Sequence, residues 1–131
     1  RDAERRTAQD AAFTAALEAE IRRLFPGCPA DRAAEIAAHA SVRGSGRVGR
    51  TAAGRALDEG AVTAAVRASV RHRDTPYDAL LLSGVPRYQA RVRVAPAIEA
   101  VLVSWRPGRG DGRPEEPGAG QARAEDRRDR P

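Results

Sequence analysis

The sequence contains no lysine, asparagine or methionine, and its 131 residues include a single cysteine and only 4% aromatic residues. One cysteine excludes an intramolecular disulfide, and with only two histidines it argues against a four-ligand structural zinc site. We therefore expect neither a metal nor another cofactor. No apolar run reaches the roughly 20 residues of a membrane span, and no signal peptide is visible. These absences favour a cytoplasmic protein without membrane contact.

All 23 basic residues are arginine, and against 18 acids they give a net charge of +5. Because alanine and arginine dominate and lysine is missing, the bias is typical of a GC-rich genome. The choice of arginine is then weak evidence for phosphate recognition, although the positive charge is real. Much of the 41% hydrophobic fraction is alanine, which buries little area, so we expect a thin core. A thin core keeps a homo-oligomer as an alternative to a monomer.

The net charge is concentrated in residues 43–73, which hold seven arginines against only Asp58 and Glu59. The rest of the chain balances to zero. A local concentration of positive charge is the electrostatic footprint of a polyanion partner, most commonly nucleic acid. A solvated charged face would show the same pattern, and that reading stays open.

The spacing of apolar residues predicts an all-α fold, a small bundle of about five helices in a single domain over residues 1–105. Pro26-Gly27 ends the first expected helix, Pro29 opens the second, and the third runs from about Leu57 to Arg73. Their apolar stripes are Phe13, Leu17, Ile21 and Leu24, then Ala33, Ile36, Ala37 and Ala40, then Val62, Val66 and Val70.

A fourth, short helix is expected after Thr75, because a threonine cap followed by proline and an acid is typical of a helix start. In this interpretation Thr75, Pro76 and Asp78 serve the cap, Leu80 to Leu82 are buried, and Gly84 ends the helix.

Pro86 opens a last helix that carries Val94, Ile98, Val101, Leu102 and Trp105. Pro96 lies inside it, so we expect a kink or a break into two pieces. Residues 106–131 contain no large apolar residue, and nine of them are glycine or proline. Such a segment cannot offset its ordering entropy, which predicts a disordered tail.

A glycine- and arginine-rich loop separates the second and third expected helices. Its candidate anion-binding residues are Arg43, Gly44, Ser45, Gly46, Arg47, Gly49 and Arg50. The spacing fits both the dinucleotide-binding and the P-loop patterns, but both need a preceding strand, and residues 35–42 read as helix. Glycines still let backbone N–H groups converge on an anion, and the arginines supply charge. A helix, a glycine turn and a second helix also resemble a helix-hairpin-helix in outline. The alternative is a mobile interhelical loop.

Arg67 and Arg71 lie four residues apart on the third expected helix, with no acid four residues away, as on a phosphate-facing helix. With His72 they complete the candidate binding residues. Arg32, His39 and Arg43 fall along one flank of the second helix, where His39 is best explained as a packing residue.

The sequence leaves open whether the chain is an enzyme. His72, Tyr77 and Asp78 could supply a base, a nucleophile and an orienting carboxylate. An arginine beside a histidine with a tyrosine downstream also resembles enzymes that cut DNA through a phosphotyrosine, but their full constellation is absent.

Several blocks resemble an uncharacterised family of bacterial and fungal proteins, domain of unknown function 2293. They are Leu24-Phe25-Pro26, Gly44 to Arg50, Val70-Arg71-His72 with Thr75, Tyr77 and Asp78, Leu80-Leu81, and Trp105. The resemblance spans about residues 17–105, and it implies that the loop and the segment from Arg71 to Asp78 are the family's signature. It supplies no activity, and Pro96 departs from the family's continuous last helix.

The sequence thus predicts a small helical domain that binds nucleic acid or another phosphorylated ligand through residues 43–51 and the helix around 57–73. Binding would be salt-sensitive and largely independent of base sequence. Two alternatives remain: an enzyme acting on a phosphate ester or nucleotide through His72 and Tyr77, and a protein-interaction module for an acidic partner.

Overall fold

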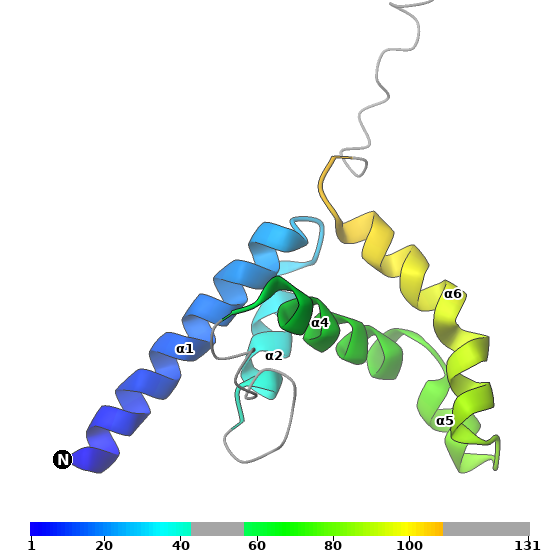
Figure 1. The fold of residues 1–131 in the computed structure, drawn as a ribbon, viewed down its shortest axis with the longest axis horizontal. Coiled ribbons are helices and arrows are strands. Elements are labelled where there is room, and N and C mark those ends of the chain that lie inside the picture. Colours follow the sequence, from blue (N-terminus) through cyan, green and yellow to red (C-terminus); the bar gives the residue numbers. More distant parts are fainter. Residues whose placement is uncertain (43–56, 109–131) are drawn as a thin grey trace, which may run out of the picture.

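The computed structural model describes residues 1–42 and 57–108 of the chain. In these residues it contains five α-helices and no strand, which confirms the all-α prediction. The helices are α1 (Asp2–Leu24), α2 (Ala30–Ala40), α4 (Glu59–Asp74), α5 (Tyr77–Leu82) and α6 (Arg87–Trp105). Figure 1 shows α2 and α4 between α1 and the α5–α6 pair. None of the described helices combines the length and apolarity that a bilayer crossing requires. Most of the predicted tail, residues 109–131, lies outside the described residues.

Helix α1 packs on α2 and α4 through its C-terminal half, where Leu17 and Ile21 are fully buried. Residues 1–9 are exposed, so the beginning of α1 extends past the other helices (Figure 1). Acids stand in its first turn and arginines in its last, the arrangement that a helix dipole favours. The helix ends at Leu24, as the Pro26-Gly27 pair predicts.

The predicted apolar stripes of α2 and α4 are confirmed. The buried residues are Ala33, Ile36, Ala37 and Ala40 in α2, and Val62, Ala65, Val66 and Val70 in α4. Helix α4 begins at Glu59, two residues later than predicted, because the Asp58 side chain caps it by accepting from Gly60 N at 2.7 Å. Leu57 stays outside the helix with a positive φ of 59°.

Helix α5 begins at Tyr77, one residue later than predicted, with Pro76 rather than Thr75 in the N-cap position. Thr75 Oγ1 still accepts a hydrogen bond from Tyr77 N at 3.2 Å. Tyr77 is the buried residue of this helix. The prediction that three leucines bury it was wrong, since Leu82 is 89% exposed and the other two are half-buried. Successive helical residues point about 100° apart, so three in a row cannot all face one core. Gly84 ends the helix with a φ of +97°.

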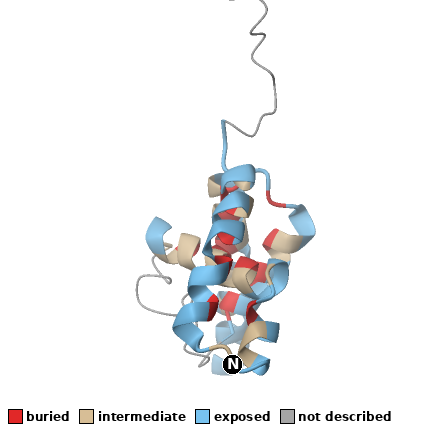
Figure 2. Cartoon of the chain, turned by 90° about the vertical axis from the view of Figure 1, so that its right-hand side faces the viewer, coloured by how far each residue is buried: buried red, intermediate tan, exposed pale blue. Residues whose placement is uncertain are grey.

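Helix α6 is one continuous helix through Pro96, so the predicted break does not occur. A proline inside a helix leaves the carbonyl four residues earlier without its donor, here that of Val92. Both Pro96 and Val92 are exposed, and this carbonyl therefore lies on the solvent side of α6. The opposite side buries Ala90, Val94, Ile98 and Leu102 against α4 and α5. Figure 2, which views the molecule from the right-hand side of Figure 1, shows buried residues as red bands between exposed parts of the helices.

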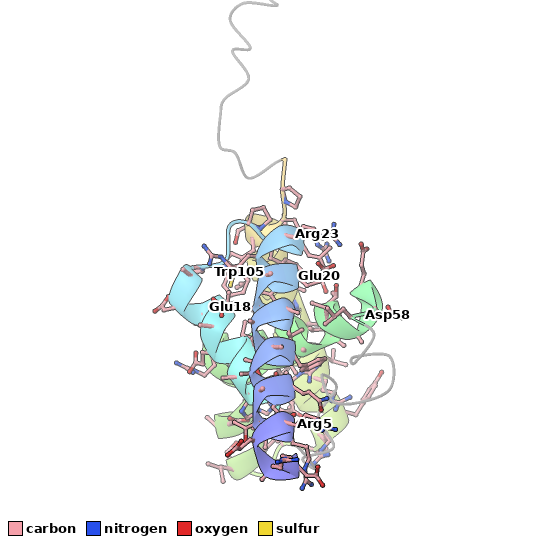
Figure 3. The ribbon with its side chains drawn as sticks, turned by 90° about the vertical axis from the view of Figure 1, so that its left-hand side faces the viewer. Arg5, Glu18, Glu20, Arg23, Asp58 and Trp105 are labelled. Atoms are coloured by element: carbon pink, nitrogen blue, oxygen red, sulfur yellow. The ribbon has the colours of Figure 1, made fainter. Side chains whose placement is uncertain are left out.

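The turn after α1 touches the end of α6, which closes the fold. Gly27 N donates to Trp105 O at 2.8 Å. A Cβ on Gly27 would lie 2.8 Å from Ser104 O and 2.9 Å from Trp105 Cα, closer than real Cβ contacts. Only glycine therefore permits these two backbones to meet. Figure 3 shows Trp105 beside the C-terminal end of α1.

Candidate functional site

The residues predicted to form the anion-binding loop lie outside the described part of the chain. They are Arg43, Gly44, Ser45, Gly46, Arg47, Gly49 and Arg50. Val42 and Leu57, the described residues on either side, follow α2 and precede α4. The loop is therefore connected to the C-terminal end of α2 and the N-terminal end of α4.

Many arginines of the described residues are paired with carboxylates. Arg23 on α1 binds Glu20 at 2.6 Å and Glu59 of α4 at 2.9 Å, and Figure 3 shows the Arg23 and Glu20 side chains on this surface. Further pairs join Arg22 to Glu18, Arg32 to Asp74, Arg67 to Glu99 and Arg73 to Glu35. The described residues carry a net formal charge of only +1, whereas residues 43–56 contain four arginines and no acid. Most of the net charge therefore belongs to the loop segment.

Arg67 and Arg71 do not form the unneutralised pair that the sequence predicts. Arg67 is paired with Glu99 of α6, an acid 32 residues away that local spacing cannot reveal. The Arg71 guanidinium lies 5.6 Å from the centroid of the Tyr77 ring, a cation–π distance. Of the two, Arg71 is the one with no carboxylate partner in the described residues.

A groove of about 640 Å³ lies between α2 and α4 and reaches the start of α5. Its lining residues are Glu35, Ile36, His39 and Ala40 from α2, Ala65, Ala68, Ser69, His72 and Arg73 from α4, and Asp78 from α5. Small apolar side chains form much of this lining, and the titratable groups join them from three helices. Both histidines of the protein therefore line one groove.

His72 and Asp78 are in direct contact in the groove. His72 Nδ1 lies 2.7 Å from Asp78 Oδ1, and both side chains are more than half exposed. A carboxylate on Nδ1 fixes the ring orientation and leaves Nε2 as the nitrogen that can exchange a proton with a ligand. Asp78 thus does more than serve the helix start.

Tyr77 is poorly placed for the nucleophilic role considered from the sequence. Its side chain is 4% exposed, and its ring meets the His72 ring edge-on with 5.6 Å between the centroids. The ring therefore supports His72 and Arg71 from the core side. Its burial follows from its position at the first turn of α5, where the helix packs on α4 and α6.

Arg32 and His39, predicted to lie on one flank of α2, are in different environments. His39 is exposed and lines the groove, so its interpretation as a packing residue was wrong. Arg32 is largely buried: its Nη1 and Nη2 donate to the two oxygens of Asp74 at 3.1 and 2.9 Å, and Nη2 also reaches Ser69. Its guanidinium lies 5.3 Å from the Trp105 ring centroid. Hydrogen bonding to Asp74 raises the pKa of Arg32 further, which keeps it charged.

Neither metal binding nor catalysis by a cysteine nucleophile is supported by the described residues. No group of three or more His, Cys, Asp or Glu side chains there is arranged to hold a metal ion. Cys28 is buried, and burial raises the pKa of its thiol, which disfavours the thiolate that a nucleophile needs.

Comparison with known proteins identifies the family. The model of the uncharacterized conserved protein family DUF2293 matches residues 20–106, and the chain belongs to this family. The match confirms the resemblance drawn from the sequence blocks, and it runs from the C-terminal turns of α1 to the residue after α6. Searches of curated proteins and of solved structures give no match.

Sequence reasoning missed the contacts that join distant segments. The Arg67–Glu99, Arg32–Asp74 and Gly27–Trp105 contacts all connect residues more than 30 positions apart. The His72–Asp78 contact was within reach, because both residues were singled out and lie six positions apart.

Proposed function

We propose that this domain binds a phosphate-bearing polyanion, most plainly nucleic acid, through residues 43–51 and helix α4. The observation that carries the proposal is the charge distribution. Four arginines without an acid in residues 43–56 contrast with a remainder that is nearly neutral and extensively ion-paired.

The ion pairs support this proposal because they identify which positive charges are already neutralised within the fold. A phosphate competing for Arg67 or Arg73 must displace a carboxylate, whereas residues 43–56 supply no carboxylate of their own. The glycines at 44, 46 and 49 add backbone N–H donors that can approach an anion closely. Arg71 and His72 are the α4 residues that we assign to the same interface.

Binding to nucleic acid would owe its affinity to counterion release, and we expect little preference for base sequence. A buried free cysteine accords with a reducing compartment, and we place the protein in the cytoplasm as part of this proposal.

The first test titrates the full chain into labelled duplex DNA and RNA and follows fluorescence anisotropy. With about four phosphate contacts, affinity should fall roughly 100-fold between about 50 and 200 mM salt. The Arg47→Ala/Arg50→Ala double variant should weaken binding about tenfold or more and flatten the salt dependence by nearly two units of slope.

The matched control for this double variant is Arg5→Ala/Arg6→Ala, which removes the same charge from the exposed beginning of α1 (Figure 3 labels Arg5). It should leave the affinity nearly unchanged. Equal losses in both variants would show nonspecific attraction, and no binding at low salt would refute the proposal. Competition by polyglutamate but not by nucleic acid would favour the acidic protein partner instead.

A second function is favoured by one specific observation, the 2.7 Å contact between His72 and Asp78 in the groove. With Nδ1 held by Asp78, His72 Nε2 can accept a proton from water as the water oxygen attacks the phosphorus of a phosphate ester. The P–O bond to the leaving group breaks, and the same nitrogen returns the proton to the leaving oxygen.

This second function predicts that the protein hydrolyses bis(p-nitrophenyl) phosphate. His72→Gln should lower the rate by about 100-fold or more. The matched variant His39→Gln removes the other groove histidine and should retain most of the activity. Absence of p-nitrophenol release from the unaltered protein would exclude this function for simple phosphodiesters.

A further inference from the structure

The outward side of the first half of α6 exposes an aromatic ring among arginines. Tyr88 is 78% exposed and Val92, one turn later, is 55% exposed. Arg87, Arg91 and Arg93 are exposed as well. We call these five residues the Tyr88 face.

Helical geometry explains why this face is presented to solvent. Ala90 and Val94 turn toward the core, and at about 100° per residue Tyr88 and Val92 must point away from it. Arg91 lies one turn beyond Arg87, and both lie on the same side of the tyrosine. The exposed ring is therefore bordered on one side by two arginines.

The charge of the Tyr88 face has no counterpart nearby. The segment from Ala79 to Ile98 contains no acidic residue. In the described part of the chain none of the three arginines forms an ion pair, unlike Arg67 and Arg73 on α4. A ligand that covers this face must therefore supply negative charge.

We infer that the Tyr88 face binds single-stranded nucleic acid, with the Tyr88 ring stacking on a base and Arg87 and Arg91 neutralising the flanking phosphates. The inference rests on the proposed function for the class of ligand and adds a second, separate contact surface to it. Exposed aromatic rings beside arginines are the stacking platforms of single-strand binders. A duplex keeps its bases stacked inside and offers the ring nothing equivalent.

An acidic protein partner fits this face less well. Its large apolar residues are Tyr88 and Val92 alone, whereas the core of a stable protein interface is apolar and depleted of charge. A ligand in which flat bases alternate with regularly spaced phosphates matches one exposed ring beside two arginines more closely.

The test compares binding of the full chain to a labelled oligo(dT) single strand and to a duplex of the same length. Tyr88→Ala should weaken binding to the single strand roughly tenfold and leave duplex binding unchanged. Tyr88→Phe should retain most of the affinity, because the ring is kept. Arg87→Ala/Arg91→Ala should lower the salt slope for the single strand by about 1.4. Val103→Ala, an exposed change near the other end of α6, serves as the control and should have no effect.

Three results would overturn the inference. The first is an unchanged single-strand affinity in Tyr88→Ala, and the second is an equal loss for single strand and duplex. The third is displacement of the DNA by polyglutamate that depends on Tyr88, which would assign the face to an acidic protein. Because these residues are exposed, thermal unfolding should be unaltered in all variants.

The same titrations separate this inference from the proposed loop site. If Arg47→Ala/Arg50→Ala keeps full affinity while Tyr88→Ala loses it, the loop proposal fails and the Tyr88 face stands. If Tyr88→Ala keeps full affinity while Arg47→Ala/Arg50→Ala loses it, only the inference about the Tyr88 face is refuted. Absence of binding to either nucleic acid refutes both.

Discussion

Gly27→Ala is expected to lower the free energy of unfolding by about 3 kcal/mol, of which about 2 arise from overpacking and about 1 from the lost hydrogen bond. The added Cβ would lie within 3.0 Å of Ser104 O and Trp105 Cα. Both are backbone atoms, so neither can rotate away as a flexible side chain would. The turn after α1 must then move off the end of α6 and break the Gly27 N–Trp105 O hydrogen bond.

Thermal unfolding followed by circular dichroism measures this effect, with an expected decrease in Tm of more than about 10 °C. Gly60→Ala is the matched control, because its Cβ would meet only the Asp58 side chain at 3.2 Å. Gly60 lies in the first turn of α4, where alanine favours helix, so this variant should be as stable as the original or slightly more so. If Gly27→Ala and Gly60→Ala are equally stable, the turn after α1 does not pack on the end of α6 as described.

Asp74→Ala should be nearly as damaging, with a loss of about 2–3 kcal/mol. It leaves the Arg32 guanidinium without its two hydrogen bonds at a site where the side chain is only 16% exposed. Asp74 is the last residue of α4, where the helix dipole disfavours an acid. Removing the Asp74 carboxylate would by itself stabilise α4 slightly. A decrease in the free energy of unfolding must therefore come from the lost contact with Arg32.

A double-mutant cycle with Arg32→Ala tests the pairing directly. We expect a coupling free energy of about 1–2 kcal/mol between Arg32 and Asp74 in urea unfolding. Arg23→Ala, which breaks the surface pairs with Glu20 and Glu59, should change stability little. A coupling near zero would mean that Arg32 is stabilised by Ser69, Glu35 and Trp105, and that the ion pair with Asp74 is incidental.

The sequence predicted the fold because most of its signals are local. Four apolar residues of α2 and three valines of α4 repeat at helical spacing, and each of them is buried. Thr75 marks the start of α5 by a hydrogen bond within two residues. The errors occurred where packing against neighbouring helices determines the outcome. Leu82, predicted to be buried, is exposed to solvent. Helix α6 does not break at Pro96, because its opposite side is packed against the core.

For the candidate site, sequence reasoning identified chemically able residues without their partners. It named His72, Tyr77 and Asp78, but Tyr77 is buried and contacts the His72 ring from the core side, whereas His72 and Asp78 pair at the surface. It read Arg67 as free, although Glu99 neutralises it. It also gave no weight to Tyr88, because a helical pattern alone does not tell which of the two tyrosines, Tyr77 or Tyr88, is exposed to solvent.

The sequence by itself determined the helices, the family and the concentration of positive charge in residues 43–73. Helical periodicity, caps and net charge depend on residues close together in the chain, so they can be read without a structure. Only the tertiary structure decided which arginines are neutralised, which histidines share a groove, and where the α1 turn meets α6. Most of those outcomes depend on contacts between residues more than 30 positions apart, for which a single sequence carries no periodic signal.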